Sequence, residues 1–524
     1  MNHLIHHSIF DSAARTPDAE ALVYGARRLS YAQLAGELDA FAAAVLAQGL
    51  GAGDRVAVYM EKRIENVAAL FGAAAAGCVF VPVNPLLKPE QVAYILADCN
   101  VRLLVTTPER LAALQPVLAA CPDLQAVMLT GPAQTDADAA ALPALLAWPS
   151  TASEKIAGHR RIDTDVAAIL YTSGSTGAPK GVVLSHRNMV AGADSVASYL
   201  GMRADERILA VLPLSFDYGL SQLTTAFLTG ACAVLINHLF ARDIVAMVEQ
   251  ERITGLAAVP PLWISLAALS WPAACTLRFI TNSGGAMPVP TVQALQQALP
   301  ATRIFLMYGL TEAFRSTYLA PEQVSVRPGS IGQAIPNAEI LVVRADGSIC
   351  DVDEPGELVH RGPLVALGYW NDRERTAQRF RAAPGQHPAL PVTELAVWSG
   401  DTVRRDAEGF LYFIGRGDDM IKVSGYRISP TEIEAVLHAT GLVTEAAAFG
   451  IEHPTLGQVI AVIAVAADAS SVDAPTLLAE CKRRLPAYMV PAQVELRTGS
   501  LPRNPNGKID RNLLRQTLRM KTAS

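Results

Sequence analysis

The chain has 524 residues, of which 51% are hydrophobic and 18% are charged; this balance excludes extensive intrinsic disorder, and the length predicts two or more domains. Its formal net charge of −6 argues against a nucleic-acid partner, because nucleic-acid binders normally carry an excess of Lys and Arg.

The N-terminal region lacks both parts of a secretion signal, which are a positively charged start and an uninterrupted apolar stretch after it. The longest apolar run, residues 67–83, contains Gly72, Gly77 and Pro82, so we expect a buried helix followed by a strand and no membrane span. Seven scattered cysteines without a CxxC pair predict free thiols in a reducing compartment, and therefore a cytoplasmic protein.

The first part of the chain alternates helix and strand signals. Ser30 and Gln33 form a capping-box pattern before an apolar stripe with helical spacing. Short apolar runs predict buried strands at 55–59, 78–83, 103–106, 126–129, 167–172 and 233–236. This alternation predicts an α/β fold with largely parallel sheets.

The pattern changes after Val324, where frequent Gly and Pro separate short strands and predict antiparallel β structure. A boundary follows at residues 415–419, and Ser-Pro-Thr-Glu at 429–432 is a strong helix start. We therefore expect a large domain over residues 1–415 and a small α+β domain over residues 416–524.

A Gly- and Ser-rich segment at 171–181, Tyr-Thr-Ser-Gly-Ser-Thr-Gly-Ala-Pro-Lys-Gly, predicts a phosphate-binding loop, because its open backbone N–H groups, hydroxyls and one ammonium suit an anion. It is not a Walker A loop, since Lys180 lies between Pro179 and Gly181. The candidate phosphate ligands are Thr172, Ser173, Gly174, Ser175, Thr176, Gly177 and Lys180.

With four further motifs, this segment resembles the adenylate-forming (AMP-binding) superfamily, which includes acyl- and aryl-CoA synthetases, luciferases and the adenylation domains of nonribosomal peptide synthesis. The further motifs lie in the family's order at 308–312, 399–401, 415–427 and 505–511. The resemblance covers nearly the whole chain. It implies a large N-terminal domain of layered α/β subdomains with a β-rich section, followed by a small, mobile C-terminal α+β domain.

The resemblance implies that ATP and Mg²⁺ activate a carboxylic acid as its acyl adenylate, with release of pyrophosphate and later transfer to a pantetheine thiol. Two anions meet in the first step, so catalysis depends on positioning and on cancelling charge. The implied roles are Mg²⁺ binding for Glu312, α-phosphate contact for Thr311, adenine contact for Tyr308, Gly284 and Gly285, ribose contact for Asp401 and Arg416, and charge neutralisation for Lys508.

In the family, the small domain rotates about a hinge between the two half-reactions. Asp418 matches the hinge position, and Gly425 and Arg427 match residues that then face the thiol or the nucleotide. This rotation carries the lysine loop away and completes a pantetheine tunnel.

The acid-binding residues are less clearly marked. Phe216 and Asp217 resemble the Phe-Asp pair of amino-acid adenylation domains, whose Asp binds the substrate ammonium; alternatively, Asp217 pairs with another protein group. The family's pocket positions correspond to Ser221, Ser283, Met307, Arg315 and Ser316. They predict a small polar cavity for a compact amino or imino acid, with a second acidic group for Arg315 unless that side chain points away.

The acceptor thiol is not specified by any motif. Because no condensation or carrier domain is present in the sequence, we expect a freestanding ligase that loads the phosphopantetheine of a carrier protein. An acyl- or aryl-CoA ligase that uses free coenzyme A is the alternative. A nucleotide sensor would not need both Glu312 and Lys508, the loop spacing excludes a P-loop phosphotransferase, and the polar pocket disfavours a luciferase-like oxygenase.

Overall fold

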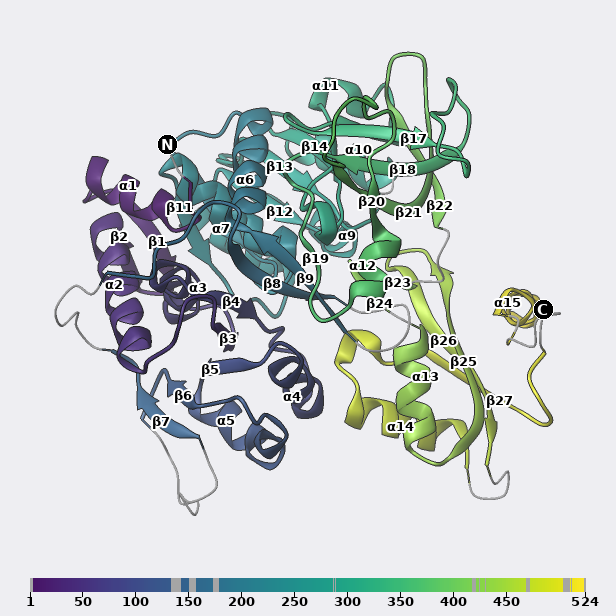
Figure 1. Ribbon diagram of the computed structural model, residues 1–524. Coiled ribbons are helices and arrows are strands. Elements are labelled where there is room, and N and C mark those ends of the chain that lie inside the picture. Colours follow the sequence, from purple (N-terminus) through teal and green to yellow (C-terminus); the bar gives the residue numbers. More distant parts are fainter. Residues whose placement is uncertain are drawn as a thin grey trace.

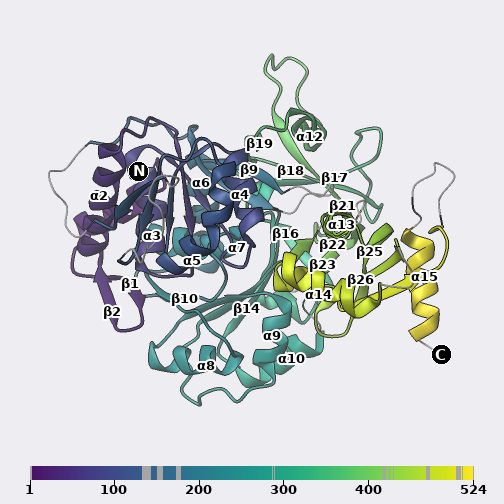
Figure 2. The same cartoon turned by 90° about the horizontal axis from the view of Figure 1, so that it is seen from below.

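The computed structural model of the protein describes residues 3–132, 143–149, 157–172, 179–285, 287, 289–416, 421–423, 425–428, 430–467, 472–502, 509 and 511–522. Within these residues the strands form three sheets, of 14, 8 and 5 strands (Figures 1 and 2). The fold is mixed α/β, as the alternating sequence pattern predicts.

The eight-stranded sheet has the order β19-β9-β8-β4-β3-β5-β6-β7, and its strands from β8 to β7 are parallel. Its strands are β3 (Arg55–Tyr59), β4 (Val79–Pro82), β5 (Val101–Thr106), β6 (Ala126–Leu129), β7 (Ala144–Ala147), β8 (Val166–Thr172), β9 (Lys180–Ser185) and β19 (Gly368–Tyr369). The apolar run at 67–83 forms the end of a helix and β4, as predicted.

Alternate side chains of this sheet enter two different cores, as the twofold period of a strand requires. Val56 and Val58 join the main core, whereas Ala57 and Tyr59 pack in a second core. Helices α4 (Pro89–Asp98) and α5 (Pro108–Leu114) cover the second core. The sheet is therefore buried on both faces, which suits its continuous apolar strands.

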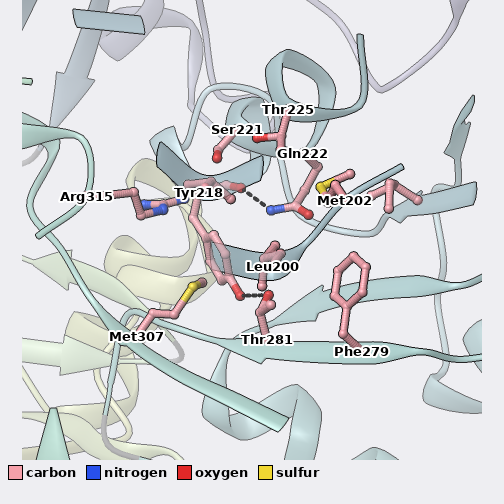
Figure 3. Close-up of a pocket in the computed structure, with 12 residues that line it drawn as sticks. Leu200, Met202, Tyr218, Ser221, Gln222, Thr225, Phe279, Thr281, Met307 and Arg315 are labelled. Carbon is pink, nitrogen blue, oxygen red and sulfur yellow. Dashed lines mark hydrogen bonds between the residues drawn. The ribbon is translucent and has the colours of Figure 1, made fainter. Parts of the chain in front are cut away.

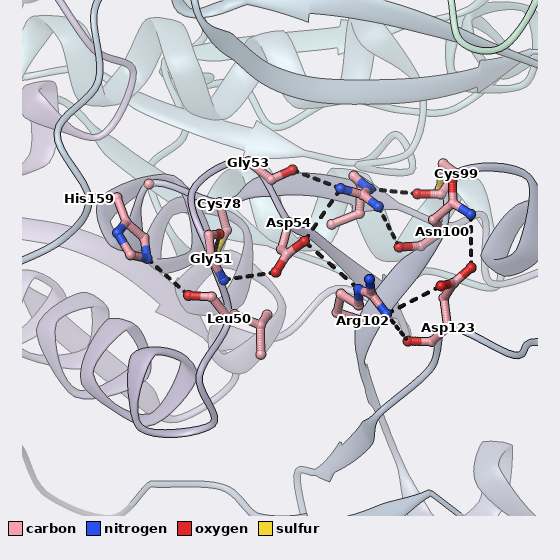
Figure 4. Close-up of polar contacts among 12 residues, drawn as sticks. Leu50, Gly51, Gly53, Asp54, Cys78, Cys99, Asn100, Arg102, Asp123 and His159 are labelled. Carbon is pink, nitrogen blue, oxygen red and sulfur yellow. Dashed lines mark hydrogen bonds and ion pairs between the residues drawn. The ribbon is translucent and has the colours of Figure 1, made fainter.

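Polar contacts join the amino ends of β3, β5 and β6 (Figure 4). Arg55 donates to the carbonyls of Cys99 and Asn100 at 2.6 and 2.8 Å. Asn100 and Arg102 both donate to the Asp123 carboxylate, at 2.8 and 3.2 Å. Ligands of open α/β sheets bind at the opposite, carboxyl ends of the strands, so we assign this network to stability.

The 14-stranded sheet has the order β17-β18-β21-β22-β16-β15-β14-β13-β12-β10-β11-β1-β2, with β20 paired to β21. It is parallel from β14 to β1 and antiparallel from β14 to β17, which confirms the antiparallel β structure predicted after Val324.

The strands of this large sheet are β1 (Glu20–Tyr24), β2 (Arg27–Ser30), β10 (Arg207–Ala210), β11 (Cys232–Leu235), β12 (Gly255–Ala258), β13 (Phe279–Asn282), β14 (Arg303–Tyr308), β15 (Thr317–Leu319), β16 (Ser330–Ala334), β17 (Glu339–Val343), β18 (Gly356–Arg361), β20 (Phe380–Ala382), β21 (Leu395–Arg405) and β22 (Leu411–Arg416).

The helices of the large region pack mainly on these two sheets. They are α1 (His7–Arg15), α2 (Tyr31–Ala47), α3 (Ile64–Ala76), α6 (His186–Leu200), α7 (Asp217–Thr229), α8 (Ala241–Gln250), α9 (Pro260–Ala267), α10 (Val289–Ala298), α11 (Pro321–Val324) and α12 (Arg373–Arg379). Side chains of α2, α3, α6 and α7 share one hydrophobic core with strands of both sheets. The predicted capping box is present, with the Ser30 hydroxyl accepting from Gln33 and Gln33 accepting from the Ser30 amide.

The five-stranded sheet is built only from strands that follow residue 420 and has the order β24-β23-β26-β25, with β27 beside β26. These strands are β23 (Ile421–Val423), β24 (Tyr426–Ile428), β25 (Val443–His453), β26 (Gly457–Ala466) and β27 (Gln493–Arg497). Helices α13 (Pro430–Ala439) and α14 (Ala474–Arg484) share one core with this sheet, and α15 (Arg511–Thr522) packs with it in another (Figure 1). Ser429, the predicted helix cap, lies outside the described residues.

All seven cysteines are free thiols, as predicted, and only Cys275 is partly exposed. None of the helices in the described parts of the chain has the length and apolar character needed to cross a bilayer. The cytoplasmic location stays a prediction.

Candidate active site

The predicted site residues gather where parallel strands of the large sheet end. β10, β13 and β14 all end at one edge, because β10, β12, β13 and β14 are parallel neighbours. The segments that follow them carry Asp217, the Ser283–Gly285 turn and Glu312. Open α/β sheets bind their ligands at this edge.

A buried carboxylate meets the ammonium of the predicted phosphate loop. Lys180 Nζ lies 3.1 Å from Glu312 Oε1, and the Tyr369 hydroxyl lies 2.7 Å from Lys180 Nζ and 2.6 Å from the same carboxylate oxygen. Arg379 Nε is 4.0 Å from Glu312. The Glu312 side chain is only 2% exposed, so it is held among cationic and hydroxyl groups away from bulk water.

The predicted nucleotide contacts form a second cluster. The Tyr308 hydroxyl, at the end of β14, donates to Asp401 Oδ2 on β21 at 2.5 Å. Asp401 is the cross-strand partner of Arg416, whose side chain lies outside the described part of the molecule. Gly284 has φ +82°, a backbone conformation that residues other than glycine rarely adopt. The turn is held by a 3.0 Å hydrogen bond from the Asn282 side chain to the carbonyl of Gly285.

Asp217 and Arg315 form a buried ion pair. Arg315 Nη1 lies 2.9 Å from Asp217 Oδ2, and the two side chains are 2% and 6% exposed. The Thr311 hydroxyl donates to the other oxygen of Asp217 at 3.3 Å. Burial raises the pKa of the Asp217 carboxyl, and Arg315 and Thr311 act against that rise. The structure therefore shows the alternative, in which Asp217 pairs with another protein group.

A small cavity lies beside this ion pair (Figure 3). The volume that the centre of a water molecule can occupy is about 10 Å³, which is room for roughly one water. It is lined by Val196, Leu200, Met202, Ile208, Tyr218, Ser221, Gln222, Thr225, Phe279, Thr281, Met307 and Arg315. Three of the five residues predicted for the acid pocket, Ser221, Met307 and Arg315, therefore line one cavity.

The other four predicted acid-binding residues, which are Phe216, Asp217, Ser283 and Ser316, lie outside this lining. Ser283 is buried, and the Ser316 hydroxyl is bonded to His360 Nδ1 at 3.0 Å. Burial lowers the pKa of His360 to about 3, so the ring is neutral at physiological pH. The Phe216 ring packs edge-on against Tyr218, with 6.2 Å between ring centroids.

Ser173, Gly174, Ser175, Thr176, Gly177, Asp418 and Lys508 lie outside the described residues, as do the side chains of Arg416 and Arg427. Thr172 ends β8, and Gly425, at φ +86°, lies against Val259, where an added Cβ would come within 2.7 Å of Val259 Cγ1.

Sequence reasoning missed Tyr369, Tyr218 and Thr225. Tyr369 lies 57 residues beyond Glu312, in a segment with no recognised motif. Tyr218 and Thr225 lie seven residues apart on α7, and the predicted Ser221 lies three residues after Tyr218, so a helical projection could have placed the three on one face.

Two family models match the chain. The first, described as AMP-binding enzyme, matches residues 9–370, and the second, described as AMP-binding enzyme C-terminal domain, matches residues 432–508.

Curated relatives are similar over nearly the whole chain. The L-proline–[L-prolyl-carrier protein] ligase of Pseudomonas fluorescens is 32% identical over 97% of this chain and 98% of its own length. The indoleacetate–CoA ligase of Aromatoleum aromaticum is 30% identical over 97% of both proteins. Tyrocidine synthase 3 of Brevibacillus parabrevis is 31% identical over 98% of this chain, which spans only 8% of that much longer protein.

The o-succinylbenzoate CoA synthetase (MenE) of Bacillus subtilis has a similar fold, with 27% identity and alignment over 97% of both chains. The TM-score is 0.83 for a double mutant of that enzyme with the product analogue OSB-NCoA and 0.67 for its complex with the acyl-adenylate intermediate OSB-AMP. These matches confirm the mixed α/β fold with a large N-terminal and a smaller C-terminal domain.

Proposed function

The chain belongs to the AMP-binding enzyme family, and on that premise we propose that it activates a small amino or imino acid and loads it on the phosphopantetheine of a carrier protein. As a member of the family it is an adenylate-forming ligase that uses ATP to activate a carboxylic acid. The choice of acid, the acceptor thiol and the residue roles below are the proposal.

The position of Asp217 supports an amino-acid substrate. Its Oδ1 lies 3.3 Å from the hydroxyl of Thr311, the residue proposed to contact the α-phosphate. The reacting carboxylate must lie next to that phosphate, and the ammonium of an α-amino acid is only one carbon away from it. A substrate ammonium could therefore contact Oδ1 while Arg315 keeps Oδ2, and the buried carboxylate would have charged partners on both oxygens.

Charge cancellation is the main task of the proposed catalytic residues. A substrate carboxylate oxygen attacks the α-phosphorus of ATP, the bond from that phosphorus to pyrophosphate breaks, and the acyl adenylate forms. We assign Lys180 to the leaving phosphates and Lys508 to the two anions that react. Asp401, beside Tyr308, would hold the ribose hydroxyls. A pantetheine thiol then attacks the acyl carbonyl and displaces AMP.

Glu312 fits the proposed Mg²⁺ site. Among the described residues, no cluster of three or more His, Cys, Asp or Glu side chains could hold a metal by itself. Mg²⁺ that accompanies a nucleotide needs only one or two carboxylates, since phosphates and water supply the other ligands. Glu312 offers such a carboxylate beside Lys180, and the bound ion would neutralise phosphate charge.

We also propose that residues 1–415 and 416–524 are the two moving domains and that the structure represents the thiol-transfer arrangement. The higher TM-score with the OSB-NCoA complex than with the OSB-AMP complex of one and the same enzyme supports this proposal. Gly425 also supports this proposal. Its Cα lies 3.6 Å from the position that a Cβ at Gly284 would take, so the small domain contacts the Ser283–Gly285 turn, which we assign to adenine binding.

Exchange of labelled pyrophosphate into ATP tests the function. We expect exchange with small amino or imino acids such as proline, alanine and aspartate, with AMP and pyrophosphate as products and no substrate-dependent ADP. Exchange only with acids that lack nitrogen would reject the amino-acid proposal and favour the acyl- or aryl-CoA ligase alternative. Transfer to a phosphopantetheinylated carrier protein, measured against free coenzyme A, identifies the acceptor.

A further inference from the structure

Four buried polar atoms around the cavity have no hydrogen-bond partner among the described residues. They are Nε and Nη2 of Arg315, Oγ of Ser221 and Oγ1 of Thr225. The three residues are 1%, 1% and 3% exposed, and all three line the cavity of Figure 3. Buried polar groups without partners are unfavourable, so their concentration around one space indicates that a polar group belongs there.

The backbone turn before Arg315 keeps this guanidinium in the interior. Phe314 has φ +55° and ψ −45°, a rare conformation for a residue with a side chain. Its ring packs where Gly192 leaves room, since a Cβ at Gly192 would lie 2.5 Å from the Phe314 ring. Strain of this kind persists when the surrounding structure enforces it, and it occurs often at ligand sites.

The contacts of Arg315 within the described structure leave one edge of the guanidinium available. Nη1 contacts Asp217 at 2.9 Å and the Phe314 carbonyl at 2.8 Å, and the Tyr218 ring lies 4.7 Å from the guanidinium carbon. Nε and Nη2, the two nitrogens without a described partner, form one edge of the fork. That edge matches the two oxygens of a carboxylate.

Resting on the proposed function, we propose that the substrate is an amino acid with an acidic side chain of about the length of aspartate. A side-chain carboxylate would accept from Nε and Nη2 of Arg315, the two buried donors without a described partner. Ser221 and Thr225 complete the subsite by donating their hydroxyls to that carboxylate.

The size of the subsite favours a short side chain. The cavity has room for about one water-sized group, which is smaller than a carboxylate, so the lining side chains must move apart even for aspartate and further for a longer side chain. The Tyr218 ring limits it, and its hydroxyl is fixed to Thr281 by a 2.6 Å hydrogen bond. Glutamate, which is one methylene longer than aspartate, is therefore a length control.

The test is pyrophosphate exchange with aspartate, glutamate, asparagine, alanine and proline. We expect aspartate to have the highest kcat/KM, on the order of 10-fold or more above its neutral isostere asparagine. Preference for alanine, proline or asparagine would overturn the acidic subsite and leave the proposed function intact. Exchange with none of these amino acids would overturn both.

A variant of α7 tests the subsite without leaving an unpaired charge. Thr225→Val should raise KM for aspartate by about 10-fold, lower the ratio of kcat/KM for aspartate to that for alanine, and leave KM for ATP unchanged, since it removes one hydroxyl and keeps the shape. The matched control is Thr224→Val, whose buried hydroxyl bonds to the Ser221 carbonyl and does not line the cavity. Equal effects of the two variants would contradict the subsite.

Discussion

The ammonium of Lys180 lies 3.1 Å from the carboxylate of Glu312, and 132 residues separate the two in the chain. Both are 15% exposed or less, and Tyr369 bonds to both of them. The ammonium therefore lies at the carboxylate that we assign to Mg²⁺. Binding of the nucleotide would move Lys180 towards the phosphates and leave Glu312 for the metal.

Glu312→Gln should lower the rate of acyl-adenylate formation by about 10²–10³, because one preorganised charged group in the site is lost. Amide oxygen is a weaker Mg²⁺ ligand than carboxylate, so the Mg²⁺ concentration for half-maximal exchange should also rise. Pyrophosphate exchange at varied Mg²⁺ measures both effects. Glu322→Gln, on the exposed face of α11, is the control and should behave as wild type. An unchanged Mg²⁺ dependence would contradict the assignment.

Lys508→Ala should abolish acyl-adenylate formation and leave transfer from a supplied adenylate largely intact. Loss of one charge-stabilising group typically lowers a rate by about 10²–10³. In the two-conformation scheme the lysine loop has left the site before the thiol attacks, so the second step should not depend on it. Separate assays of the two half-reactions decide the matter, since equal losses in both are inconsistent with the scheme.

Asp217→Asn should weaken both folding and substrate binding. It leaves the Arg315 guanidinium buried without its counter-charge, at a cost of about 3–5 kcal/mol in the free energy of unfolding. Urea denaturation followed by tryptophan fluorescence measures this change. The double variant Asp217→Asn/Arg315→Gln should recover most of the stability but not the low KM for the amino acid. If the double variant is no more stable than the single one, the broken ion pair is not the cause of the lost stability.

The docking of the small domain should depend on pH through Glu432. This residue of α13 is 9% exposed and bonds to Gln91 of α4 at 3.2 Å, and burial raises its pKa from 4.5 to about 7. Below pH 4.5 the carboxyl is protonated whether docked or not. Between pH 4.5 and 7 the docked form keeps the proton, so docking weakens as pH rises, by at most about 3 kcal/mol, the value for a carboxyl that undocking exposes fully.

Glu432→Gln should remove this dependence, because the amide stays neutral. Hydrogen exchange at α4 and α13, compared between variant and wild type at the same pH, should show better protection in the variant at pH 8 and equal protection at pH 4.5. Glu90→Gln, at an exposed position of α4, is the control. Equal protection of wild type and variant at pH 8 would show that Glu432 does not control docking.

Local patterns predicted the local structure well. The Ser30–Gln33 capping box and the strand at 126–129 formed as expected, because neighbours along the chain determine them. The motif residues could be grouped from the family resemblance, and Gly284, Tyr308 and Glu312 lie at the carboxyl ends of β13 and β14.

The pairings inside the site could not be predicted in this way. Asp217 and Arg315 lie 98 residues apart, and their contact depends on the positive φ of Phe314, which no propensity rule assigns to a phenylalanine. The bond of Tyr369 to Glu312 also arises from tertiary packing, since β19 joins the eight-stranded sheet whereas Glu312 follows β14 of the other sheet.

The pairing of β1 with β11 has a consequence for synthesis of the chain. Leu22 lies beside Ala233, so the hairpin of β1 and β2 gains its parallel neighbour only after more than 200 further residues have been made. At a synthesis rate of about 5–20 residues per second, the apolar edge of this hairpin stays unpaired for roughly 10–40 s. The nascent chain therefore needs protection from aggregation during that interval, and slower translation before residue 235 would prolong the exposure.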